Sequence, residues 1–245
     1  MAFLQEPERQ PFLRVPAAAA GLIVILIVAH VARVLAPAGI SGAIIANFAF
    51  YPARYSQAFL VAHGNYHQTF WDLAIPFVSY IFLHANLTHL AINCVWLLPF
   101  GAVTARRFGA LVFFPLFLLC GVAGAIAHLF THWGTMNYVI GASAAIAGLM
   151  GAAFRVLSLT DGNDSSRRSS RSGRAEALEP LAPIFSTRIL VWSAIWITLN
   201  VVAGVTGLGT GPNAGPVAWQ AHIGGYLAGV LLAGPCDLLR RRLRA

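Results

Sequence analysis

The stretch ALVFFPLFLLCGVAGAIAHLF, residues 110–130, is an apolar run without a single acidic residue, lysine or arginine. A helix that crosses the hydrocarbon core of a membrane needs about 20 mostly apolar residues, and this stretch has that length. Lipid offers no hydrogen bonds, so a spanning segment must satisfy its backbone internally. The stretch therefore predicts a transmembrane helix and an all-α membrane protein.

The composition of the whole chain agrees with a membrane location. Hydrophobic residues make up 58% of the 245 residues, charged residues make up 10%, and the mean hydropathy is +0.71. A soluble domain carries about 25% charged residues because its surface faces water. So few charges cannot cover a globular surface, whereas a surface that faces lipid needs few.

Five further segments have the length of a span or nearly so. The six predicted spans are residues 16–35, 82–101, 110–130, 142–159, 189–206 and 216–235. We therefore predict one polytopic six-helix bundle over residues 16–236. A short cytoplasmic segment, 1–15, precedes it, and a basic cytoplasmic tail, 237–245, follows it.

Two long connections differ in character. Residues 36–80 are rich in aromatic side chains, which favour the headgroup region, so we expect an outer interfacial loop. Residues 160–186 are rich in Ser, Arg, Gly and Pro, which is typical of a flexible polar loop.

The arginines predict the orientation of the helices. All 16 basic residues are Arg, and if the N-terminus is cytoplasmic, only Arg33 and Arg54 fall on the outer side. Cytoplasmic loops of membrane proteins carry an excess of Arg and Lys. Six spans with both termini in the cytoplasm satisfy this rule at every loop. The same distribution argues against a nucleic-acid partner, because the positive charge is divided among ordinary cytoplasmic loops.

Polar residues in a bilayer core are costly, so those in the predicted spans are functional candidates. The second span opens with HANLTHLAIN, residues 84–93, in which His89 and Asn93 share a helix face. His84 falls where the helix begins, with Asn86 or Thr88 as its cap. Taken by itself, this group is better explained as polar contacts between helices.

The fourth and sixth spans contain GASAAIAGLMG at 141–151 and AHIGGYLAG at 221–229. His222 shares a helix face with Gly225 and Gly229, and this small-residue stripe predicts tight packing on the small residues of the fourth span. A base must lie within about 2.6–3.2 Å of the hydroxyl that it deprotonates, so such packing suits a nucleophile and a base. Ser143 and His222 are the candidates for these roles.

A carboxylate behind the histidine is not expected. No acidic residue lies within a predicted span, and only Asp72 lies on the outer side. The arrangement would therefore be a dyad, in which packing rather than a carboxylate orients His222.

Together these motifs resemble the rhomboid family of intramembrane serine proteases, over nearly the whole chain. The family pattern places His-x4-His-x3-Asn in the second helix, Gly-x-Ser in the fourth and Ala-His-x-Gly in the sixth. Here these positions read His84, His89, Asn93; Gly141, Ser143; and Ala221, His222, Gly224. Their order matches the predicted topology, which makes the resemblance specific, although each motif alone would be weak.

The resemblance implies a six-helix rhomboid-like bundle of the bacterial type, in an inner (plasma) membrane. It implies a protease that cleaves peptide bonds in or near transmembrane segments of other membrane proteins, with Ser143 as nucleophile and His222 as general base. His89, Asn93 and the backbone N–H of Ser143 would donate hydrogen bonds to the oxyanion. The supporting residues would be His84, Gly141, Gly225 and Gly229. The resemblance implies no metal and no cofactor, and it makes the fifth helix a lateral gate for substrate.

The chain departs from the family pattern in four places. Ala144 replaces the usual Gly after the serine, and Ala147 stands where many members have an aromatic ring against the histidine. The Trp-Arg pair of the first loop is absent, with Trp71 and Asp72 as a substitute, and the Glu usual after the second helix is missing. None of these changes removes a catalytic group, but they leave the orientation of His222 and the substrate preference open.

Two other functions stay open. A catalytically silent rhomboid-like protein would bind transmembrane clients without cleaving them. A zinc enzyme would use the imidazoles of His84, His89, His128 and His132, although the sequence has no HExxH motif and no Glu nearby to act as base. A transporter is not indicated, because no charge lies near the middle of a predicted span and no inverted repeat is visible.

Overall fold

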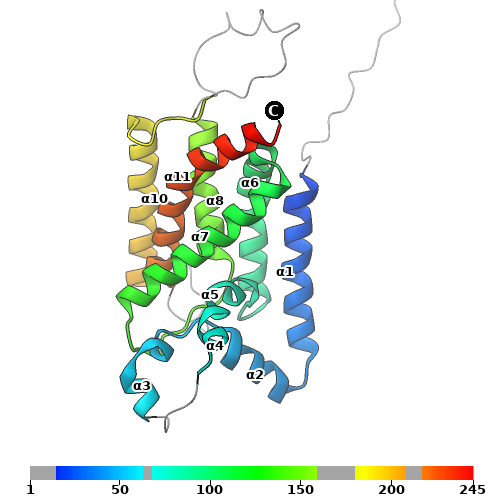
Figure 1. Ribbon diagram of the computed structural model, residues 1–245, viewed down its shortest axis with the longest axis vertical. Coiled ribbons are helices and arrows are strands. Elements are labelled where there is room, and N and C mark those ends of the chain that lie inside the picture. The colour runs from blue at the N-terminus through cyan, green and yellow to red at the C-terminus, as the bar shows by residue number, and fades with distance from the viewer. Residues whose placement is uncertain (1–14, 63–67, 159–179, 208–216, 245) are drawn as a thin grey trace, which may run out of the picture.

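A computed structural model describes residues 15–62, 68–158, 180–207 and 217–244, and this part of the chain contains helices and no strand. The helices form an elongated bundle (Figure 1). Five of them are long and apolar enough to cross a membrane, so the predicted all-α membrane fold is confirmed. They are α1 (Ala17–Leu35), α6 (Leu87–Phe108), α7 (Ala110–Thr131), α10 (Thr187–Thr206) and α11 (Trp219–Arg242).

The fourth predicted span is shorter than expected. It forms α8 (Ser143–Leu157), a helix of 15 residues. At 1.5 Å per residue such a helix is about 22 Å long, less than the hydrocarbon core of about 30 Å. Most of α8 is buried, because α6, α7 and α11 pack around it. The site-bearing helix is therefore enclosed by protein at the centre of the bundle (Figure 1).

The bounds of two predicted spans are wrong. Where the sequence predicted a helix over 82–101, α6 begins five residues later, because Leu83 is extended and the side chain of Asn86 caps the helix. The Asn86 side chain accepts from the backbone N–H of His89 at 2.8 Å, which confirms the cap. The helix ends only before Gly109, whose φ is 72°. Similarly, α11 passes through Pro235 and continues to Arg242, so most of the predicted tail is helical.

The first long connection is built from short helices where a mixed loop was predicted. They are α2 (Ala38–Phe48), the 3-10 turn η1 (Pro52–Tyr55), α3 (Gln57–Ala62), α4 (Phe70–Ala74), α5 (Pro76–Ser79) and the 3-10 turn η2 (Tyr80–Phe82). Pro37, Pro52 and Pro76 stand where three of them begin, and proline suits the first helical turn because its missing N–H has no partner there. The place of this segment at the membrane interface stays a prediction.

The two ends of the bundle differ in their arginines. Figure 1 shows that α1 begins and α11 ends at one end, while α2 to α5 gather at the opposite end. Arg33 and Arg54 contact the second group, through Ser41 and the carbonyl of Asn47 respectively. At the other end, Nε of Arg107 in α6 donates to Oδ1 of Asp237 in α11 at 2.7 Å. Within the described residues, these arginines thus divide between the ends as the sequence predicted; which end faces the cytoplasm stays a prediction.

Candidate active site

The side chains of Ser143 and His222 are hydrogen-bonded. Oγ of Ser143 lies 2.8 Å from Nε2 of His222, although the two residues are 79 positions apart. Ser143 is the first residue of α8, and His222 lies in the first turn of α11. The distance falls within the about 2.6–3.2 Å that proton transfer to a base requires. The two residues proposed from the sequence as nucleophile and base therefore meet in the fold.

Glycines allow this contact. A Cβ atom on Gly225 would overlap the carbonyl group of Ala144, and one on Gly229 would overlap that of Gly148. The predicted tight packing of the fourth segment on the sixth is therefore confirmed, with backbone against backbone. Because Ala144 directly follows Ser143, the contact at Gly225 fixes the position of Ser143 along the axis of α11, next to His222.

The turn into α8 also depends on a glycine. Gly141 has a φ of 111°, a backbone conformation that residues other than glycine rarely adopt. Its N–H donates to the carbonyl of Tyr80 at 2.9 Å. A Cβ at this position would lie 2.7 Å from Nε2 of His89. The first N–H groups of a helix have no partner within the helix and carry a partial positive charge. The start of α8 at Ser143 thus favours a negative charge beside the hydroxyl.

His89 and Asn93 lie next to this turn. Nδ2 of Asn93 would be 3.8 Å from a Cβ on Gly141, and it donates one hydrogen bond to the carbonyl of His89 at 2.8 Å. Asn93 is buried, with 3% of its surface exposed. An amide nitrogen has two hydrogens, so one remains for an oxyanion. The fold brings both predicted donors to the loop that leads into Ser143, and their role stays a proposal.

His84 packs behind His89. Its ring is fully buried, and its centroid lies 5.2 Å from that of His89 and 6.4 Å from that of His30 in α1. Its backbone oxygen accepts from Nη2 of Arg33 at 2.7 Å. These contacts join α1 to the residues just before α6, and the supporting role of His84 stays a proposal.

Asn200 is a site residue that the sequence analysis missed. Its Oδ1 lies 3.0 Å from Nδ1 of His222, on the side of the ring opposite Ser143. The expectation that packing, rather than a carboxylate, would orient His222 did not include this amide, which also contacts the ring. Asn200 lies within the apolar helix α10. A polar amide in a membrane-spanning helix is energetically costly, and this signal in the sequence could have identified Asn200 as a functional candidate.

Carboxylates and metal ligands do not gather at this site in the described residues. Asp237 is paired at the other end of the bundle, and Asp72 caps α4 through Thr69. Among the described residues, no three His, Cys, Asp or Glu side chains come together in a group that would hold a metal ion. His128 and His132 stack on each other at 4.2 Å. The structure gives the four-imidazole zinc site no support.

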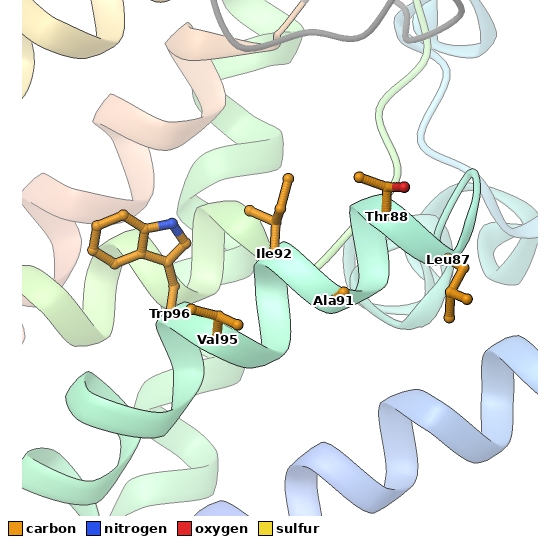
Figure 2. Close-up of a pocket in the computed structure, with 6 residues that line it drawn as sticks. All are labelled: Leu87, Thr88, Ala91, Ile92, Val95 and Trp96. Carbon is orange, nitrogen blue, oxygen red and sulfur yellow. The ribbon is translucent and has the colours of Figure 1, made fainter.

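A shallow apolar hollow runs along α6 (Figure 2). Its six lining residues come from one stripe of the helix: Leu87, Thr88, Ala91, Ile92, Val95 and Trp96. Successive residues of a helix point about 100° apart, so His89 and Asn93 lie on the neighbouring face, one position after Thr88 and Ile92. The hollow thus lies on the exposed face of α6, whereas Asn93 is buried on another face of the same helix.

Comparison with known proteins gives two kinds of match. Residues 67–236 match the family model described as Rhomboid domain. The chain is 34% identical over 98 residues to the rhomboid protease GluP of Bacillus subtilis, covering 40% of this chain and 17% of that protein. It is 31% identical over 155 residues to the RHOMBOID-like protein 5 of Arabidopsis thaliana, covering 63% of this chain and 41% of that protein. The chain thus spans less than half the length of either relative.

Proposed function

The chain belongs to the rhomboid family, and on that basis we propose that it is an intramembrane serine protease with a Ser143–His222 dyad. The observation that carries this proposal is the hydrogen bond of 2.8 Å between Oγ of Ser143 and Nε2 of His222. We place the protein in the inner membrane of a bacterium, with both termini in the cytoplasm. Its substrates are transmembrane segments of other proteins.

The reaction follows from the geometry of the site. Oγ of Ser143 attacks the carbonyl carbon of the scissile peptide while its proton passes to Nε2 of His222. The carbonyl oxygen becomes an oxyanion, which accepts hydrogen bonds from His89, Asn93 and the N–H of Ser143. The C–N bond then breaks as His222 gives the proton to the leaving amine. A water molecule, deprotonated by His222, hydrolyses the ester and restores the serine.

Access for a substrate helix is lateral in this proposal. The hollow on α6 offers an apolar surface on the helix that carries the proposed oxyanion donors, and α10 exposes most of its side chains. A substrate helix has its backbone bonded internally, so its scissile peptide must unwind before Ser143 can attack. Spans with Gly, Pro or Ser near their outer end should therefore be cleaved faster than a poly-Leu span.

A fluorophosphonate probe tests the proposal, because it forms an Oγ–P bond with an activated serine and releases fluoride. The purified protein should be labelled and should cleave a reporter whose span carries Gly and Pro near its outer end. Ser143→Ala should lose both activities. Ser158→Ala, at the other end of α8, is the matched control and should keep both.

The outcomes separate the alternatives. Folded protein that neither reacts with the probe nor cleaves the reporter would be a silent member of the family that binds clients. Cleavage that survives in Ser143→Ala and stops with a chelator would indicate a metal enzyme. Either result would overturn the serine-protease proposal.

A further inference from the structure

The amide group of Asn200 is held in one orientation. Its Nδ2 donates to the carbonyl oxygen of Trp196 at 3.0 Å, which leaves Oδ1 facing Nδ1 of His222, also at 3.0 Å. An amide oxygen can only accept a hydrogen bond, so Nδ1 must carry the proton of the neutral imidazole. The other ring nitrogen, Nε2, then has its lone pair free for the hydroxyl proton of Ser143.

We propose that Asn200 is the positioning residue of His222 and that it makes the competence of this base depend on the place of α10 in the bundle. The inference rests on the proposed function, in which Nε2 takes the proton of Ser143. While Asn200 accepts from Nδ1, the ring cannot turn over or exchange its tautomer without breaking a hydrogen bond. Asn200 itself acts only through the histidine.

A single stripe of residues attaches α10 to α11. Its members recur at intervals of three or four, so they share one helix face: Ser193, Trp196, Asn200 and Gly204. Oγ of Ser193 lies 2.7 Å from the hydroxyl oxygen of Tyr226, and the Trp196 ring stacks on the Tyr226 ring with centroids 4.4 Å apart. A Cβ on Gly204 would overlap the Trp219 ring. Of these contacts, the one made by Asn200 reaches the proposed base.

Outside this stripe α10 meets the end of α8, where Arg188 donates to the carbonyl of Ser158 at 2.8 Å and the Trp192 ring lies 6.0 Å from that of Phe154. Ile189 is the one buried residue of this helix. Leu199, next to Asn200, is 63% exposed. A helix that is held along one stripe can separate from its neighbour without breaking a buried core. Such a separation would take the acceptor away from His222, so the base is oriented only while α10 lies against α11.

Nitrogen NMR of protein labelled with 15N-histidine tests the positioning role without relying on activity. The His222 signals, assigned by their loss in His222→Ala, should show protonated Nδ1 and unprotonated Nε2 in the parent protein. Asn200→Leu, which keeps the shape of the side chain but removes the acceptor, should give a mixture of tautomers. A fixed Nδ1–H tautomer in Asn200→Leu would overturn the inference. Correct tautomers in a protein without protease activity would contradict only the proposed function.

Kinetics then test whether the orientation matters for the base. Asn200→Leu should lower kcat and the rate of fluorophosphonate labelling by about 10- to 100-fold, with KM nearly unchanged. Asn200→Asp keeps an acceptor oxygen and should recover most of the labelling rate. Thr198→Val, which changes an exposed polar residue of the same helix, is the matched control and should label like the parent protein. Ser193→Ala removes a different link between α10 and α11 and should slow labelling less than Asn200→Leu does, because the acceptor for Nδ1 of His222 stays in place. An equal loss in Ser193→Ala and Asn200→Leu would mean that the loss comes from weaker attachment of α10 and not from the missing acceptor, and would overturn the positioning role.

Gly204→Ala tests the dependence on α10, because its methyl group would push α10 away from Trp219. It should slow labelling as Asn200→Leu does, and the double variant should be no slower than the slower single variant. Losses that multiply would show that the two positions act independently and would overturn the coupling.

Discussion

Gly229 of α11 lies directly against the backbone carbonyl of Gly148 in α8, with no room for a methyl group between the two helices. This contact, one turn beyond that of Gly225, sets the separation of the helices that carry Ser143 and His222. Small-residue faces permit such backbone approach in membrane proteins. The geometry of the dyad is thus determined by atoms that take no part in the reaction.

Gly229→Ala should therefore destabilise the protein and weaken the dyad. Overpacking in a well-packed core costs about 1–3 kcal/mol, and here a backbone carbonyl would have to move. We expect a lower midpoint of thermal unfolding in detergent and slower fluorophosphonate labelling. Gly21→Ala in α1, where a Cβ would meet nothing within 4 Å, is the matched control. Equal unfolding midpoints for the two variants would contradict the packing role.

Ser143 and His222 should behave as one unit in double-mutant kinetics. If His222 activates Ser143, either deletion abolishes the same step, so the losses cannot add. Ser143→Ala should be inactive, His222→Ala nearly so, and the double variant no worse than the worse single variant, in reporter cleavage at matched protein levels. Activity kept in His222→Ala would exclude His222 as the general base but would still allow Ser143 to be the nucleophile.

Asn93→Ala should lower turnover without unfolding the protein. Removal of one oxyanion donor costs about 10²–10³ in kcat in other enzymes. Because Asn93 donates within its own helix to the carbonyl of His89, its truncation removes no hydrogen bond between the described helices. Reporter cleavage and thermal unfolding, measured on the same preparation, check both parts. Turnover within a few-fold of the parent protein would leave His89 and the backbone N–H as the donors.

Asp237 should matter more for stability than an exposed ion pair would. Its side chain is 7% exposed and that of its partner Arg107 is 8% exposed. Removing one member of a buried pair costs about 3–5 kcal/mol, because the other charge stays buried. Asp237→Ala should therefore unfold at a clearly lower temperature. Arg241→Ala, which removes the second contact of Asp237 from a 43% exposed side chain, should cost about 0–1 kcal/mol. The reverse order would contradict this assignment.

Cysteine labelling should fix the orientation in the membrane. In a background without Cys94, Cys120 and Cys236, an impermeant maleimide added to intact cells should label a cysteine at Asn137. It should not label one at Ser170, which lies outside the described residues. The expectation comes from the division of the arginines. Labelling of position 170 from outside would invert the proposed topology.

The contact between Ser143 and His222 was predictable because the small residues and the polar residues of the two helices point to the same helix–helix contact. The glycines around Ser143 and those after His222 require helices that touch, and that contact brings the two polar side chains together. Helical periodicity was sufficient for this step, since it depends only on which residues share a face.

Asn200 was not found, because periodicity within α10 does not say which neighbour its polar side chain meets. The start of α6 was misplaced for a related reason. Residues Tyr80 to Phe82 are as apolar as a span, and only the cap at Asn86 shows where the helix begins. The short helices of residues 36–80 depend on prolines in a segment without a clear period. Hydropathy locates long helices well, whereas short ones depend on local backbone chemistry.

The enclosure of α8 has a consequence for hydrophobic mismatch. Outer helices respond to a thinner or thicker bilayer by tilting, whereas α8 is surrounded by α6, α7 and α11 and is held to α11 through glycine contacts. Very little of the surface of α8 is therefore exposed for contact with lipid. A change in acyl-chain length should therefore alter the depth at which a client helix presents its peptide bond, while the spacing of Ser143 and His222 stays constant.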